Sequence, residues 1–514
     1  MAVESGPKSK GSALRADCEM PMATRGLRVL AKSSTPLLRR TLSNSISETR
    51  PCARILDAEC SGAAALPARG SCGVPARSYG SATNRTADTE LSKNWSKTPP
   101  AARRLSGEPE KAFSDDEDHE ILDYPGAKTN FTHEMTFIPE TAAEPVPCFR
   151  LLNDFGQPLP WAKLPQMDAE LATKIYRNMV NLQTMDAIFY EAQRQGRFSF
   201  YLTTHGEEAI NIASAAALSP QDVVFTQYRE PGILMWRGFT MQDFADQCFG
   251  NAADLGKGRQ MPVHYGSREL NCPTLSSPIA TQLPQAVGAA YGLKMSRKDA
   301  CSVAYFGDGA SSEGDFHAAL NFAAILETPT IFICRNNGWA ISTPTNDQFR
   351  SDGIVVKGRG YGIRSIRVDG MDTLALYCAV KEARKIAIEE SRPVLIEALS
   401  YRVGHHSTSD DSSKYRKKAE IEHWKLVRDP VNRFKKWIEA QGWWDAKSEK
   451  AIRSEARSSV IAAMNKAGQK QKPELSNLFT DVYDSLPSNL REQELQLRDV
   501  IAKYPRGYPT DVPL

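Results

Sequence analysis

Apolar and polar positions divide the chain into a leading part without periodicity and a longer periodic part. Residues 1–165 carry no sustained apolar period. From Asp168 to Gln195 apolar residues recur at spacings of three or four, which predicts an amphipathic helix that ends before Gly196.

Strand-like and helix-like segments alternate between about residues 205 and 400. Short apolar or β-branched runs predict strands at 222–225, 302–306, 330–334, 365–368 and 394–398. Longer runs between them predict helices at 209–218, 240–249, 282–295, 315–326 and 373–390. This alternation predicts an α/β fold in which a parallel sheet has helices on both faces. Such sheets bind ligands at the carboxyl ends of their strands.

The pattern changes again near residue 415, where charged amphipathic helix returns. Four tryptophans are expected to anchor this region by packing: Trp424, Trp437, Trp443 and Trp444. We therefore expect four parts: a leading segment at 1–86, an N-terminal arm or linker at 87–165, an α/β domain at 166–414, and a helical C-terminal region at 415–514. The arm mixes Pro with apolar residues around 137–161, as in a segment that wraps over a neighbouring subunit.

Charge and composition exclude several classes of protein. The 64 basic and 61 acidic residues nearly cancel, which argues against a dedicated nucleic-acid binder. No run of about 18 apolar residues occurs, so no membrane span is expected. The ten cysteines form no C-x-x-C pair, which is typical of a reducing compartment.

The leading segment differs from the rest in charge. Residues 1–86 hold 13 basic and 6 acidic residues, and residues 22–47 hold no acid. An Arg-rich, Ser-rich and acid-poor start is typical of a mitochondrial transit peptide, which places the mature protein in the mitochondrial matrix. We expect removal near residues 77–79 and leave the initiating Met open between Met1, Met20 and Met22. The alternative is a basic tail that carries no targeting signal.

The strongest chemical signal is Gly307-Asp308-Gly309 followed by Asn336-Asn337. Each motif stands at the carboxyl end of a predicted strand, and one βαβ unit brings Asp308 and Asn337 to the same sheet edge. Carboxylate, amide and carbonyl oxygens suit Mg²⁺. Gly307 and Gly309 allow close backbone approach and unusual turns, and the following helix offers N–H groups to a phosphate. The pattern predicts a diphosphate held through Mg²⁺.

This arrangement resembles the thiamine diphosphate signature, and further segments resemble the alpha subunit of branched-chain 2-oxo acid dehydrogenases. These segments are residues 227–230 (QYRE), 258–266 (GRQMPVHYG), 276–282 (SSPIATQ) and 401–411 (YRVGHHSTSDD). The resemblance covers roughly residues 145–510. The His-His-Ser form at 405–407 favours the branched-chain enzymes over their pyruvate relatives.

The resemblance implies a set of ligands for each cofactor. Mg²⁺ would be held by Asp308, Asn337 and the carbonyl of Trp339, where relatives usually carry Glu at the first position and Tyr at the third. Thiamine diphosphate would contact residues of several segments: Tyr228, Arg229, Ser277, Ile279, Gly307, Gly309, Ala310, Arg335 and His406. A potassium ion would be bound by Ser276, Pro278, Thr281 and Gln282.

Several of these residues keep a simpler alternative. Residues 276–282 equally fit a helix N-terminal segment. Met261 and His264 either line the acyl pocket or simply pack. His406 either moves protons during acyl transfer or only contacts phosphate. The resemblance makes Ser407 a phosphorylation site for a regulatory kinase, whereas the family's second phosphorylated Ser is replaced here by Lys417.

The resemblance also implies the reaction and its partners. The activity would be oxidative decarboxylation of branched-chain 2-oxo acids derived from Leu, Ile and Val, as in a 3-methyl-2-oxobutanoate dehydrogenase that transfers a 2-methylpropanoyl group to the lipoyl group of a transacylase core. The carboxylate for the aminopyrimidine ring would come from a beta subunit in an α2β2 heterotetramer, so neither Glu207 nor Glu208 receives that role. Alternatives are a pyruvate-type alpha subunit and a non-catalytic assembly or regulatory subunit.

Overall fold

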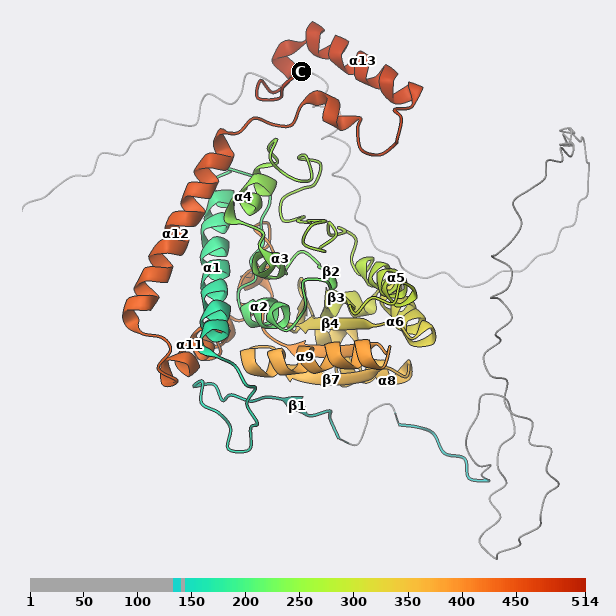
Figure 1. Cartoon of the computed structure of the whole chain (residues 1–514), viewed down its shortest axis with the longest axis vertical. Coiled ribbons are helices and arrows are strands. Elements are labelled where there is room, and N and C mark those ends of the chain that lie inside the picture. Colours follow the sequence, from blue (N-terminus) through green and yellow to red (C-terminus); the bar gives the residue numbers. More distant parts are fainter. Residues whose placement is uncertain (1–132, 140–143) are drawn as a thin grey trace, which may run out of the picture. The chain divides into compact units, whose positions relative to one another are not determined.

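The computed structural model describes residues 133–139 and 144–514. Within them, six parallel strands form one sheet in the order β1-β7-β8-β4-β3-β2 (Figure 1). The strands are β1 (Cys148–Phe149), β2 (Val223–Phe225), β3 (Ser302–Gly307), β4 (Thr330–Asn336), β7 (Arg364–Asp369) and β8 (Val394–Leu399). The predicted parallel α/β fold is therefore confirmed.

Side chains of the central strands alternate between two cores, because successive residues of a strand point to opposite faces. In β3, Val303 and Tyr305 join one core, whereas Ala304 and Phe306 join the other. Helices α1, α2 and α9 contribute to the first core, and α5 and α6 to the second. Both faces are covered, which explains why these strands are continuous apolar runs in the sequence.

The helices around the sheet begin and end close to the predicted positions. They are α1 (Ala169–Arg194), α2 (Glu208–Ala216), α4 (Met241–Phe249), α5 (Gln282–Met295), α6 (Gly314–Leu326) and α9 (Thr373–Glu389). Capping fixes two of the starts: Asp168 accepts from the N–H of Leu171, and Thr240 forms a capping box with Asp243. Three helices are too short to show a period and were not predicted: α3 (Pro231–Arg237), α7 (Thr345–Gln348) and α8 (Val355–Gly360). A small hairpin, β5 (Trp339–Ala340) and β6 (Thr343–Pro344), precedes α7.

The C-terminal region is helical, as predicted. Its helices are α10 (Lys418–Val427), α11 (Pro430–Ala440), α12 (Ala446–Gln469) and α13 (Ser488–Lys503). Helix α12 packs along α1 and α4 (Figure 1). Trp437 is buried, Trp443 and Trp444 pack against the first core, and Trp424 stacks on Tyr401. Among the described residues, no helix is both long and apolar enough to cross a membrane.

Part of the predicted arm joins the sheet of its own chain. Strand β1 pairs with β7, and the N–H groups of Leu151 and Leu152 both donate to Asp372 at 2.7 and 2.6 Å. A two-residue strand shows no period, so the sequence did not reveal it. The predicted domain limits stay predictions, and the predicted transit peptide lies outside the described residues.

Candidate functional site

The carboxyl ends of β2, β3, β4 and β8 surround a cavity of about 210 Å³. Gly307 pairs with Arg335 in the sheet register, so Asp308 and Asn337 follow the ends of adjacent strands. Both side chains line the cavity. The remaining lining residues are Gln227, Tyr228, Arg229, Ile279, Gly307, Gly309, Ala310, Glu313, Arg335, Trp339, Ala340, Ile341, Arg402 and His406.

Oxygen atoms suited to a hard cation meet in this cavity. Asp308 is 1% exposed, and its Oδ2 accepts from Gln348 Nε2 at 2.8 Å. Burial raises the pKa of this carboxyl group. Asn337 Oδ1 accepts from the N–H of Trp339 at 3.2 Å, and the Trp339 carbonyl accepts from Arg402 Nη1 at 3.3 Å. A buried carboxylate beside an amide and a carbonyl oxygen fits Mg²⁺ by donor chemistry.

Three buried guanidinium groups line the same cavity. Arg229, Arg335 and Arg402 are each 2% exposed. Arg229 donates to the Thr203 carbonyl at 2.7 Å and to the His406 carbonyl at 2.6 Å. Burial lowers the pKa of Arg229, and burial together with the charge of Arg229 lowers the pKa of Arg402 to about 10. Neighbouring buried cations of this kind favour a bound anion.

His406 lies between two of these cations and is neutral. Burial, followed by the charges of Arg229 and Arg402, lowers the pKa of His406 to about 3. Its Nδ1 lies 3.1 Å from Arg229 Nη2 and 3.4 Å from Arg402 Nη1. Because a guanidinium can only donate, Nδ1 must accept, which assigns the ring proton to Nε2. The imidazole therefore carries one N–H for a ligand or a proton transfer.

In the Gly307-Asp308-Gly309 motif, the structure shows close packing against a glycine and no left-handed backbone conformation. Neither Gly307 nor Gly309 has a positive φ, contrary to expectation. A Cβ on Gly309 would meet the Ala340 Cβ at 2.7 Å, so packing against the β5–β6 hairpin explains this glycine. The helix predicted at 315–326 is α6, which starts at Gly314, and a 3₁₀ turn, η1 (Asp308–Ser312), begins in the motif and precedes this helix. The N–H groups nearest the cavity thus belong to the 3₁₀ turn.

The loop before α5 brings together the groups expected to bind potassium. Thr281 Oγ1 donates to the Pro278 carbonyl at 3.1 Å and shares a hydrogen bond of 2.7 Å with Ser276 Oγ. Gln282 Oε1 is buried and has no hydrogen-bond partner among the described residues. Thr281 is the N-cap residue of α5 and makes no side-chain cap bond to it, so the segment also has the place of a helix N-terminal segment. A monovalent cation fits the four oxygen groups by donor chemistry.

Ser277 is linked to His264. The Nδ1 of His264 lies 3.1 Å from the Pro262 carbonyl and must donate to it, so Nε2 accepts from the Ser277 hydroxyl. His264 is buried, and Ile279 from the same loop lines the cavity. A role of His264 in the acyl pocket stays a prediction.

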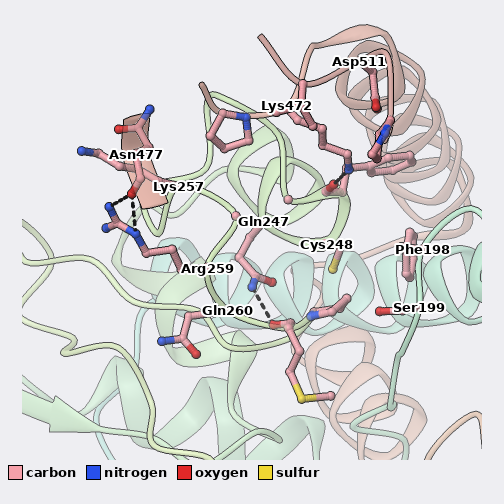
Figure 2. Close-up of a pocket in the computed structure, with 18 of the residues that line it drawn as sticks. Phe198, Ser199, Gln247, Cys248, Lys257, Arg259, Gln260, Lys472, Asn477 and Asp511 are labelled. Atoms are coloured by element: carbon pink, nitrogen blue, oxygen red, sulfur yellow. Dashed lines mark hydrogen bonds between the residues drawn. The ribbon is translucent and has the colours of Figure 1, made fainter. Parts of the chain in front are cut away.

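Met261 lies in a different hollow, of about 570 Å³ (Figure 2). This hollow is lined by residues of the 257–262 loop and of the C-terminal segment, and it shares no lining residue with the cavity at the sheet edge. Gln247 Nε2 donates to the Met261 carbonyl at 2.9 Å, and Arg259 Nε donates to the Asn477 carbonyl at 3.1 Å. A direct role of Met261 in an acyl pocket stays a prediction.

Ser407 is buried beside the cavity and is 7% exposed. Its Oγ accepts from the N–H of Ser409, while the N–H of Thr408 donates to the Tyr201 carbonyl at 2.9 Å. The loop is therefore bonded to the domain, and a kinase would have to open it to reach Ser407.

The sequence analysis gave no role to four residues of the site: Glu207, Glu230, Gln348 and Arg402. Arg402 follows the end of β8, so the strand-end rule that found Asp308 applies to it as well. Glu207 and Glu230 precede α2 and α3 as their N-cap residues, and Gln348 ends the short helix α7. Glu230 lies in the QYRE segment but was given no role there, and no sequence pattern marks Glu207 or Gln348.

Comparison with known proteins identifies a family. Residues 176–476 match the family model described as dehydrogenase E1 component. The chain is 64% identical over 396 residues to 2-oxoisovalerate dehydrogenase subunit alpha 2, mitochondrial, from Arabidopsis thaliana, which covers 77% of this chain and 84% of the relative. It is 50% identical over 388 residues to the alpha subunit of that enzyme from Homo sapiens, covering 76% of this chain and 87% of the relative. The Dictyostelium discoideum alpha subunit is 52% identical over 365 residues, covering 71% and 83%.

Proposed function

The chain belongs to the dehydrogenase E1 component family, and from that premise we propose that it is the alpha subunit of a thiamine diphosphate-dependent enzyme that oxidatively decarboxylates branched-chain 2-oxo acids. The cavity at the sheet edge carries the proposal. There a buried carboxylate and amide lie with three buried guanidinium groups. A magnesium-bound diphosphate matches both sets of groups.

The metal would be held by Asp308, Asn337 and the Trp339 carbonyl. Asp308 retains the charge of the Glu that relatives usually carry there. A backbone ligand does not depend on the Trp side chain at 339. Gln348 holds one oxygen of Asp308, which fixes how the carboxylate faces the cavity.

The diphosphate would be held by Arg229, Arg335, His406 and Tyr228, with the turn at Gly307–Ala310 beneath it. When bound, thiamine diphosphate supplies a carbanion that adds to the ketone carbon of the acid and an electron sink for the loss of carbon dioxide. The chain would position this group and exclude water around the diphosphate, since Asp308, Arg229, Arg335 and Arg402 are all buried. His406 offers its Nε2–H to a phosphate oxygen or to the acyl group during transfer.

A potassium ion would order the loop of residues 276–282. Its ligands would be Ser276, Pro278, Thr281 and the unpartnered Oε1 of Gln282. The ordered loop would place Ser277 and Ile279 against the aminopyrimidine ring. Met261 and His264 remain proposed contributors to the acyl pocket.

The site would be completed by a beta subunit in an α2β2 heterotetramer. Glu207 and Glu230 are already engaged, because both pair with Arg335. An apolar face on α5 and α6 supports a large partner surface, and its exposed members are Tyr291, Met295, Phe322, Ile325 and Leu326. Large exposed apolar patches mark interaction surfaces. The acyl group would then pass to the lipoyl group of a transacylase core.

Phosphorylation of Ser407 would switch the enzyme off. A phosphate adds about −1.5 to −2 charges, which would repel the diphosphate beside His406 and open the loop. The kinase would act on a transiently opened loop, since Ser407 is buried. The relatives are named mitochondrial, which supports the matrix as the location of this protein.

Substrate profiling of the complex co-expressed with its beta subunit tests the proposal. We expect kcat/KM for 3-methyl-2-oxobutanoate to exceed that for pyruvate at least about tenfold, because apolar pockets discriminate methyl groups by this order. The reverse preference would identify a pyruvate-type alpha subunit. A complex that is inactive on both acids and does not bind thiamine diphosphate would identify an assembly subunit.

A further inference from the structure

Glu207 joins two groups of the cofactor cavity. Its Oε2 accepts from Arg335 Nη1 at 2.8 Å, and its Oε1 accepts from Asn337 Nδ2 at 2.7 Å. The residue is the N-cap of α2, yet its side chain makes no cap hydrogen bond. Both carboxylate oxygens are therefore directed to the site and not to the helix.

The backbone at this position is held from several sides. Gly206 has φ +92°, and a Cβ there would meet the Tyr401 carbonyl oxygen at 2.1 Å, so only glycine fits. The N–H of Glu207 donates to the Thr204 carbonyl at 2.8 Å, and the Asn211 side chain donates to the Glu207 carbonyl at 3.1 Å. The backbone that carries the Glu207 side chain is thus held in place.

A carboxylate here selects one orientation of the Asn337 amide. Since an ionised carboxylate can only accept, the NH₂ end of Asn337 must face Glu207. The oxygen end then faces away, where it already accepts from the N–H of Trp339 and keeps a second lone pair for a cation. A glutamine in place of Glu207 would accept or donate equally well and would impose no such choice.

Arg335 is fixed by the same residue. Its Nη1 bonds to Glu207 and its Nε contacts Glu230, while Nη2 lies 4.0 Å from the position that a Cβ on Gly307 would take. Glu230 already supplies one counter-charge, so stability alone gives little reason for a second buried carboxylate. What Glu207 adds is the link between Arg335 and Asn337.

We propose that Glu207 is a positioning residue of the cofactor site, which turns Asn337 Oδ1 toward the metal and Arg335 Nη2 toward the diphosphate. The inference rests on the proposed function and extends it to a residue outside the ligand set. Such outer partners typically change metal affinity by about 10–100-fold when removed.

The test is a Mn²⁺ titration of the complex of this chain with its beta subunit, at saturating thiamine diphosphate, with free Mn²⁺ read by electron paramagnetic resonance. Glu207→Gln should weaken Mn²⁺ binding about 10–100-fold. The matched control is Glu208→Gln, which changes a fully buried neighbouring carboxylate whose Oε2 accepts from the Gly206 N–H. The control should bind Mn²⁺ as the wild type does.

Thermal midpoints of the cofactor-free complexes separate positioning from structure. If Glu207→Gln lowers the midpoint while Mn²⁺ affinity stays at the wild-type value, the residue is merely structural and the proposal is wrong. If this variant fails to assemble, Glu207→Asp decides, since it keeps the charge but shortens the reach: weaker Mn²⁺ binding supports positioning, and wild-type affinity overturns it. A wild-type complex that binds no Mn²⁺ with thiamine diphosphate contradicts the proposed function itself.

Discussion

At the scale of single residues, the buried arginines at the sheet edge carry positive charges that the carboxylates of this chain neutralise only in part. Arg229 and Arg402 are buried, and their guanidinium groups share the Nδ1 of His406 as an acceptor. Their charges and burial hold the pKa of His406 at about 3. A bound anion would reverse this effect, because an opposite charge nearby favours the protonated imidazole.

This reversal predicts proton uptake on cofactor binding. At pH 6 His406 is neutral in the free site, and its pKa should rise when the diphosphate binds, so the complex should take up part of one proton. Calorimetry of thiamine diphosphate binding in buffers of different ionisation enthalpy measures that proton number. His406→Gln should show a smaller uptake than the wild type at pH 6, and the difference should shrink at pH 8. An equal proton number in both proteins at pH 6 would contradict this role of His406.

At the scale of elements, the site residues at strand ends could be predicted from the sequence, whereas the residues on very short elements could not. Asp308 and Asn337 follow β3 and β4, whose apolar runs and β-branched residues mark them in the sequence. Gln348 reaches Asp308 from the four-residue helix α7, and Leu151 reaches Asp372 from beside the two-residue strand β1. Elements of this length leave no period, so tertiary packing alone places them.

Helices α5 and α6 carry several large apolar side chains that are exposed. Phe322, Ile325 and Leu326 on α6 are 58%, 75% and 38% exposed, and Gly288 and Gly292 on α5 leave open space beside them. Small residues allow another helix to approach closely, and fully burying one large apolar side chain contributes about 1.5–3 kcal/mol. The pair is therefore the surface where we expect the beta subunit to dock.

Ile325→Asp should weaken association with the beta subunit at least about tenfold, since it removes apolar burial and places a charge in the contact. Sedimentation or light scattering at several concentrations gives the assembly state. Ile461→Asp is the control, because Ile461 is a single exposed apolar residue on α12, 38% exposed. A variant at 325 that assembles like the wild type would exclude this face as the contact.

At the scale of the whole molecule, the sequence predicted the fold more fully than it predicted the set of residues that form the site. The parallel sheet, its covering helices and the place of Asp308 and Asn337 at one sheet edge follow from local pattern, whereas Arg229, Arg335 and His406 were expected only from the family resemblance. The network of Glu207, Glu230 and Arg335 does not, because Arg335 lies more than 100 positions after both glutamates and no periodic face links them.

The most direct test of the account is thiamine diphosphate binding by the complex with and without Mg²⁺, for the wild type and for Asp308→Ala. We predict Mg²⁺-dependent binding by the wild type and a loss in the variant greater than the roughly 10–100-fold typical of outer partners. Binding that ignores Mg²⁺, or that survives the loss of the Asp308 carboxylate, would contradict the assignment of this sheet edge as the cofactor site.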